Sequence, residues 1–128
     1  MSRGVISLVA AVALLAPAMP AAVAAPHNHY GESARKVARE INCKRFDRNG
    51  SGHFNKDSGV CWVKGKRVNV ITFRGPRQQR DWNDYAKALL PDGHWWANGK
   101  GALVTARNGN KPAAKIGAKR LPGVLKHS

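Results

Sequence analysis

Two histidines are the side chains best suited to acid–base chemistry. His53 or His94 could serve as a general acid or base, because an imidazole side chain can take a proton from a substrate and return it. A small secreted ribonuclease would combine such a histidine with a glutamate and an arginine. The chain has only two glutamates, Glu32 and Glu40, and both lie on or just before the first predicted helix. A lone histidine in a strand or loop is more often structural.

The standard catalytic motifs are missing from the sequence. There is no Gly-x-Ser-x-Gly elbow, no phosphate-binding loop and no pair of neighbouring carboxylates. No thiol nucleophile remains once the two cysteines pair. We therefore predict no catalytic residue and a protein that is not an enzyme, with a small secreted nuclease as the alternative.

Two short segments offer metal ligands, and neither makes a complete site. His27 and His29 are two residues apart, but fewer than three convergent ligands make a weak zinc pattern, and a flexible terminus is the favoured interpretation. Residues 47–52 match the first half of a calcium loop. Its twelfth position should be a bidentate Glu and is Ser58, which favours an ordinary polar turn. The sequence predicts no metal site and no cofactor.

The only two cysteines, Cys43 and Cys61, are predicted to form a disulfide. Export would place them in an oxidising compartment, where one intramolecular pairing is possible. Closing this loop stabilises a fold by roughly 3 kcal/mol in the chain-entropy view. A zinc site is the alternative, but this spacing without a third soft ligand nearby is poor zinc spacing.

Positive charge is the strongest compositional feature. The chain has 22 Lys and Arg against 7 Asp and Glu, and no acidic residue follows Asp92. This balance favours contact with polyanions such as nucleic acid, anionic wall polymers or lipid headgroups, although a generic basic surface is the alternative. The predicted polyanion-binding residues are three lysines on one helical stripe, Lys111, Lys115 and Lys119, together with Arg107 before it and Lys126 after it.

Adjacent tryptophans provide a possible aromatic platform. Trp95 and Trp96 lie in a predicted strand, so their side chains point to opposite faces, and one should be in the core. The other could stack on bases or sugars. The alternative is that a helix or loop covers it. Trp82 shares a helical face with Tyr85 and Leu89, which favours the core.

Residues 1–24 have the three-part layout of a secretion signal. A short charged start precedes an uncharged apolar stretch, and Ala22-Val23-Ala24 is a small-residue cleavage pattern. A transmembrane anchor is the alternative, but the strongly apolar part, residues 5–16, is short for a bilayer. We expect a secreted protein whose mature chain has no transmembrane segment and, without Arg3, a net charge of +14, one less than the +15 of the precursor. Residues 25–32 are predicted to be a flexible lead, and residues 33–128 a single domain.

Hydrophobic periodicity and turn residues predict an α+β fold. An N-terminal helix precedes two ββα units, so four strands form an antiparallel sheet whose helices pack on one face. Asn98-Gly99 is the strongest hairpin signal in the chain. The predicted helices are 33–42, 76–90 and 111–120, and the predicted strands are 60–63, 68–73, 94–97 and 102–106, with a polar loop over 45–58.

Several short motifs follow one another along the chain in a recognisable order. They are Cys43…Cys61-Trp62-Val63-Lys64-Gly65, Val68-x-Val70-x-Thr72-Phe73, Gln79-Arg80-Asp81-Trp82, Gly93-His94-Trp95-Trp96 and Ala113-Ala114…Leu121-Pro122-Gly123. In this order they resemble a group of small secreted or lipid-anchored actinobacterial proteins of uncharacterised function, over roughly residues 43–123. Pro122 stands where that group usually has Gly. The resemblance implies export, a disulfide and an α+β domain, but no activity and no functional residue.

These observations together favour a secreted, strongly basic, non-catalytic binding protein. Its expected partner is an extracellular polyanion, either nucleic acid or an anionic cell-wall polymer. The alternative is a small exported inhibitor or antagonist of a secreted or competitor enzyme. Polyanion binding would be salt-sensitive, whereas protein inhibition would show a defined stoichiometry and survive moderate salt. No long basic amphipathic helix supports direct action on membranes.

Overall fold

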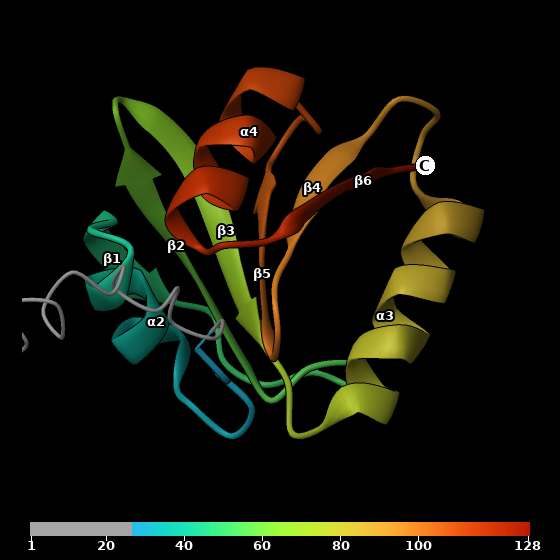
Figure 1. Ribbon diagram of the computed structural model, residues 1–128, viewed down its shortest axis with the longest axis horizontal. Helices are drawn as coiled ribbons and strands as arrows, with labels where there is room; N and C mark the ends of the chain where they lie inside the picture. The colour runs from blue at the N-terminus through green and yellow to red at the C-terminus, as the bar shows by residue number, and fades with distance from the viewer. Residues whose placement is uncertain (1–26) are drawn as a thin grey trace, which may run out of the picture.

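The computed structural model describes residues 27–128, so the predicted signal peptide and its cleavage site lie outside the described part of the chain. Six antiparallel strands form one sheet, in the spatial order β1-β2-β3-β5-β4-β6 (Figure 1). The α+β class is therefore confirmed. In chain order the elements are α2 (Ala34–Glu40), β1 (Lys44–Arg48), β2 (Asp57–Val63), β3 (Lys66–Thr72), α3 (Pro76–Leu89), β4 (Trp95–Asn98), β5 (Ala102–Ala106), α4 (Lys111–Arg120) and β6 (Val124–His127).

Local sequence signals set the ends of the three described helices. The Ser33 hydroxyl caps α2 by accepting a hydrogen bond from the Lys36 amide, and Asn110 caps α4 in the same way through the Ala113 amide. Pro76 begins α3, where its missing N–H costs nothing. The helices predicted at 33–42, 76–90 and 111–120 are therefore found at nearly the same places.

Helices cover both faces of the sheet, so the prediction of helices on one face is wrong. In the core, α2 and α4 pack with Val68, Val70 and Val104 on one face. Residues of α3 pack on the opposite face with Trp96 and Leu103, and Figure 1 shows α3 apart from the other two helices. Neighbouring strand residues point to opposite faces, and both sets are apolar here. Each face therefore has to be covered, a need that the order of elements alone does not reveal.

The sheet has six strands rather than the predicted four. β1 lies in the segment predicted as a polar loop, and β6 follows the last helix, where no strand was expected. Both are edge strands: β1 pairs only with β2, and β6 pairs only with β4. Four of the five β1 residues are exposed, so no hydrophobic alternation marks it. Pairing with a neighbouring strand, rather than local sequence, creates these two elements.

A disulfide joins Cys43 to Cys61, as predicted, with the two Cα atoms 5.5 Å apart. Cys61 is fully buried in β2, and Cys43 lies between α2 and β1. The bond therefore ties the connection between α2 and the edge strand β1 to the neighbouring strand β2. Within residues 27–128, no helix is both long and apolar enough to span a membrane.

Side chains from distant segments fix both ends of α2. The Asp57 carboxylate on β2 accepts hydrogen bonds from the Ala34 amide at 2.8 Å and from Arg48 Nε at 2.9 Å. Burial alone would raise the pKa of Asp57, but these hydrogen bonds outweigh it and lower the pKa. At the other end, Arg120 Nη1 on α4 donates to the Ile41 carbonyl at 3.1 Å. The helix is therefore held in place relative to the sheet.

Candidate functional site

The turn between β2 and β3 carries an exposed lysine, Lys64, in a left-handed backbone conformation. Val63 pairs with Lys66, so Lys64 and Gly65 form a two-residue turn with φ of +48° and +73°. Such turns favour Asn-Gly, because both positions need a left-handed backbone that other L-residues adopt only at a cost of about 1–2 kcal/mol. A lysine in the first position is therefore a strained choice, and strain of this kind collects at functional sites.

A hollow of about 510 Å³ lies on one side of this turn. Three cations line it, Lys66 and Arg67 from β3 and Arg107 from the end of β5. Asn110 also lines it, and this residue caps the N-terminus of α4, which adds a partial positive charge. The hollow thus combines three full positive charges with a helix end of the same sign.

A second hollow of about 440 Å³ lies beside the same turn. Lys44, Arg45 and Lys64 line it together with the indole of Trp62, which is 38% exposed. Trp62 pairs with Lys44 on β1 and with Arg67 on β3, so the three side chains share one face of the sheet. Arg45 also has a positive φ, +56°, at an irregularity in the β1 pairing.

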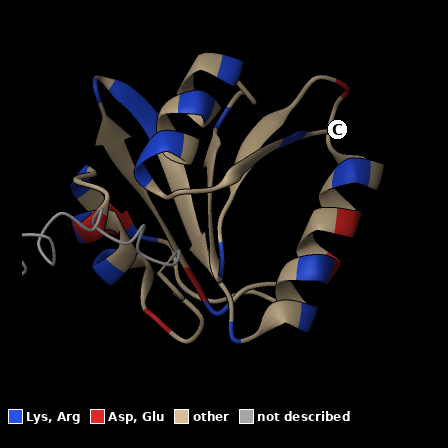
Figure 2. Cartoon of the chain, in the orientation of Figure 1, with Lys and Arg blue, Asp and Glu red and all other residues tan. Residues whose placement is uncertain are grey.

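We call this region the cationic tip: Lys44, Arg45, Trp62, Lys64, Lys66, Arg67 and Arg107. No acidic residue of the described chain lines either hollow, and no cation of the tip forms an ion pair within residues 27–128. Figure 2 shows Lys and Arg at the end of the β2–β3 hairpin and along α4, with the acidic segments elsewhere. Like charges gathered in this way create a local potential that attracts anions.

The structure brings only part of the predicted polyanion-binding set together. Arg107 lines the first hollow, and the α4 lysines, Lys111, Lys115 and Lys119, are all exposed and begin beside it. Lys126 is separated from them. It pairs with Trp96 across β6 and β4, and therefore points to the α3 face, where it lines a hollow that also contains Asp84.

The two adjacent tryptophans point to opposite faces, but neither presents a free ring. Trp96 is fully buried, and its indole N–H donates to Asn83 Oδ1 at 2.8 Å. Trp95 is half-buried, with Lys111 Nζ 4.4 Å from its ring centroid and the His127 ring 4.5 Å away. The exposed indole beside cations is that of Trp62, which was not among the predicted site residues. A signal was present, because Lys64-Gly65-Lys66-Arg67 follows Trp62 closely.

Within residues 27–128, neither histidine considered for catalysis forms an ion pair with a carboxylate. His94 Nε2 lies 3.2 Å from Thr105 Oγ1, and the ring rests against the Gly109 backbone, where a Cβ would clash with it. Burial lowers the pKa of His94, which favours its neutral form. His53 is exposed and packs edge-on against Phe54. Neither arrangement resembles an oriented acid–base pair.

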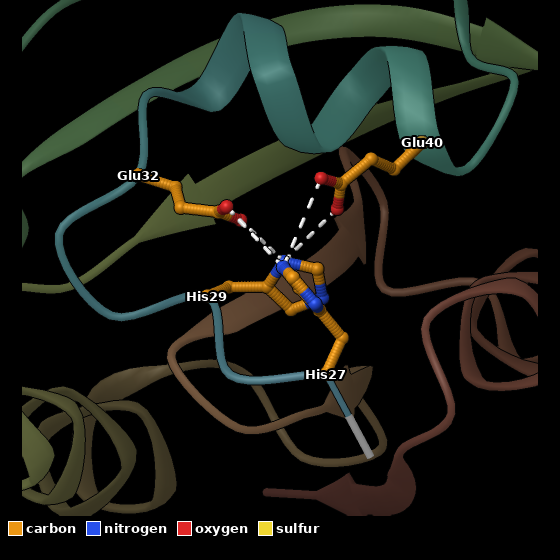
Figure 3. A group of neighbouring side chains, drawn as sticks. All are labelled: His27, His29, Glu32 and Glu40. Atoms are coloured by element: carbon orange, nitrogen blue, oxygen red, sulfur yellow. Dashed lines mark hydrogen bonds and ion pairs between the residues drawn. The ribbon is translucent and has the colours of Figure 1, made fainter. Parts of the chain in front are cut away.

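A second group of polar side chains lies at the N-terminal end of the described chain. His27 and His29 come from the segment before α2, Glu32 lies just ahead of the helix cap, and Glu40 is the last residue of α2 (Figure 3). One donor atom from each lies within 4.8 Å of the others. We call these four residues the His–Glu cluster. It contains both glutamates of the chain.

The segment predicted to be a flexible lead runs along the domain from His27 onward. The His29 amide donates to the Lys100 carbonyl at 2.9 Å, and the Gly31 amide donates to the Phe73 carbonyl at 2.9 Å. His29 is only 4% exposed. These contacts tie residues 29–31 to the end of the sheet and hold the histidines beside α2.

Comparison of the chain with protein-family models, with curated proteins and with solved structures finds no match. The resemblance to the actinobacterial group stays a prediction. The functional argument therefore rests on the geometry of the cationic tip and of the His–Glu cluster.

Proposed function

We propose that the protein binds extracellular polyanions, without catalysis, at the cationic tip. The observation that carries this proposal is the pair of hollows on either side of the β2–β3 turn, lined by six cations and no carboxylate. Anionic groups spaced along a polymer would occupy both hollows at once. Each contact would release a counterion, so the affinity would fall as salt rises.

The exposed indole of Trp62 supplies a contact that pure charge does not. It lies between Lys44 and Arg67 on one face of the sheet, beside the second hollow. A base or a sugar ring could stack on this indole while the neighbouring cations hold the backbone phosphates. Stacking of a base on an aromatic side chain contributes about 1–3 kcal/mol in single-stranded nucleic acid complexes. Trp62 therefore favours nucleic acid over a polymer of simple phosphodiesters.

The α4 lysines extend away from the first hollow, on the face of the sheet opposite Trp62. Lys111 follows Asn110, which lines the first hollow, and Lys119 stands about 12 Å farther along the helix at 1.5 Å per residue. No residue of the described chain forms an ion pair with these lysines. A polymer that entered the first hollow could therefore continue along α4 and meet a cation at every turn.

A salt series on matched variants tests the proposal. The tip variant Lys66→Gln/Arg67→Gln/Arg107→Gln removes the three cations of the first hollow. The control variant Arg77→Gln/Arg80→Gln/Lys87→Gln removes the same charge from exposed positions of α3, where Asp81 and Asp84 are interspersed. The probes are a single-stranded oligonucleotide and a poly(glycerol phosphate) of similar length.

The tip variant should bind more weakly, and its plot of log affinity against log salt should be shallower by up to about three units. The control variant should change the slope by less than one unit. Equal losses in both variants would mean that net charge, and not the tip, determines binding. If the unmodified protein binds neither polymer at physiological salt, the polyanion proposal fails and a protein partner of defined stoichiometry is favoured.

A further inference from the structure

We propose that the His–Glu cluster, made of His27, His29, Glu32 and Glu40, binds a single zinc ion. This inference is independent of the proposed polyanion binding, because it concerns a different part of the molecule and a cation rather than an anion. Its basis is the convergence of two imidazole nitrogens and two carboxylates on one point (Figure 3).

The spacing of the four donors suits a tetrahedral ion. Zinc binds histidine nitrogen and carboxylate oxygen at about 2.0–2.2 Å, which places ligand atoms of a tetrahedron about 3.3–3.6 Å apart. His29 Nδ1 lies 2.7 Å from a Glu32 oxygen and 3.2 Å from a Glu40 oxygen. His27 Nε2 lies 3.3 Å and 3.8 Å from the other oxygens of the same two carboxylates. Small movements of side chains would bring all four to the required separation.

Hydrogen bonds alone leave this arrangement incompletely satisfied. A ring nitrogen carries at most one hydrogen, yet His29 Nδ1 faces two carboxylates within hydrogen-bonding distance. The same two carboxylates also face His27 Nε2. One cation at the centre would contact all four groups at once. Zinc binds neutral imidazole and ionised carboxylate, the two kinds of ligand that meet here.

Lys36 would compete with a zinc ion for the Glu32 carboxylate. Its ammonium lies 2.9 Å from the Glu32 carboxylate, one helical turn away. Burial opposes ionisation of Glu32, but hydrogen bonds from Lys36, His29 and His27 outweigh this effect and lower its pKa to about 2. Lys36 therefore already occupies the Glu32 carboxylate. Zinc would have to displace the lysine from it.

The donor set selects zinc over the common hard cations. Calcium and magnesium take oxygen ligands almost exclusively, whereas two imidazoles with two carboxylates suit zinc. Four protein ligands also leave no open position, which is typical of structural sites. The ion would hold the segment before α2 against the last turn of that helix, because His27 lies in this segment and Glu40 is the last residue of α2.

Calorimetric titration of the chelator-treated protein with zinc chloride at pH 7.5 tests the proposal directly. We expect one ion per chain, a rise in the melting temperature with zinc and no effect of calcium. Cobalt(II) should give the intense visible absorption of a tetrahedral complex. Absence of zinc binding by the unmodified protein would overturn the proposal without any variant having to fold.

Four variants distinguish a metal site from a network of ion pairs. His29→Gln and Glu40→Gln should each weaken zinc binding by at least about tenfold, because each removes a ligand. The matched control His53→Gln removes an exposed histidine outside the cluster and should leave affinity unchanged. Lys36→Gln should tighten binding, because it removes the competitor for Glu32. Unchanged affinity in both ligand variants, or weaker binding in Lys36→Gln, would contradict the proposed site.

Discussion

At the cationic tip, Lys64, Lys66 and Arg67 lie next to one another, and none forms an ion pair within the described chain. In the His–Glu cluster, each of the two carboxylates contacts both imidazoles, and Glu32 also contacts Lys36. Both regions belong to one strongly basic chain with seven acidic residues. The difference is that the cluster places groups of opposite charge in contact, whereas the tip gathers cations without an acidic partner in the described chain.

The backbone conformation also differs between the cationic tip and the His–Glu cluster. Asn42, Arg45 and Lys64 are the non-glycine residues with a positive φ in the described chain, and two of these three line the second hollow of the tip. The His–Glu cluster, in contrast, is built on a regular helix and on a hydrogen-bonded turn at Tyr30-Gly31, where glycine takes the positive φ. The tip thus combines backbone strain with unneutralised charge, an arrangement that costs stability unless an external anion compensates for it.

The largest expected effect comes from the α4 lysines. Changing Lys111, Lys115 and Lys119 together to Gln should leave the fold intact, because all three are exposed. If α4 extends the tip as proposed, polymer binding should weaken and the salt slope should fall by up to about three units. A salt series with heparin or an oligonucleotide measures this. An unchanged slope would confine the site to the two hollows.

The second prediction separates stacking from charge. Trp62→Ala should weaken binding to a single-stranded oligonucleotide by about 1–3 kcal/mol, because the exposed indole can no longer stack on a base. Binding to poly(glycerol phosphate) should change little, and the salt slope should stay the same for both polymers. Trp95→Ala is the control, because Lys111 and His127 already cover that ring. Equal effects of the two substitutions would exclude Trp62 as the stacking surface.

The regular elements could be predicted from the sequence because their signals are local. Caps and apolar spacing marked α2 and α4, and turn residues marked the β2–β3 and β4–β5 hairpins. The edge strands β1 and β6 could not be found in this way. Their residues are mostly exposed, and pairing with β2 and β4 makes them strands. The face that each helix covers also depends on packing between distant segments.

The same distinction explains which site residues could be predicted. Lys111, Lys115 and Lys119 share one helix, so their spacing alone places them in a stripe. The hollow beside Trp62 needs the pairing of β1 with β2, which brings Lys44 beside Trp62 across 18 positions of chain. In the His–Glu cluster, the two histidines looked like an incomplete metal pattern. The glutamates join them only because the chain reverses direction between the lead and α2.

The third prediction concerns the internal neutralisation of Glu32. Its folded-state pKa of about 2 lies below the ordinary 4.5, so its stabilising contribution is present above pH 4.5 and is lost as the pH falls toward 2. The full difference corresponds to about 3 kcal/mol, and exposure of Lys36 and His27 to solvent reduces this to about 1–2 kcal/mol.

Urea unfolding at pH 5 and pH 2.5, with a chelator present, measures this contribution. The unmodified protein should lose about 1–2 kcal/mol more stability between these pH values than the Glu32→Gln variant does. Asp57 titrates in both proteins, so its effect cancels in the comparison. The tip variant Lys66→Gln/Arg67→Gln/Arg107→Gln should lose as much as the unmodified protein, because it leaves Glu32 untouched. The same loss in Glu32→Gln would show that this carboxylate gains nothing from the cluster.

The smallest expected effects come from Lys64→Asn, which should stabilise the fold and weaken polymer binding. This substitution tests whether the tip is less stable than it could be because its residues serve binding. Lys64→Asn should raise the free energy of unfolding by about 0.5–1 kcal/mol, because asparagine tolerates the left-handed backbone of this turn at lower cost. The same substitution removes one cation of the second hollow, so the salt slope should fall by about one unit. Lys66→Asn is the matched control, because it removes the same charge from a β3 position without a positive φ. It should reduce the slope without stabilising the fold. If Lys64→Asn is stabilising and binding is unchanged, the turn lysine is not part of the site; if it is destabilising, the strain argument for the tip fails.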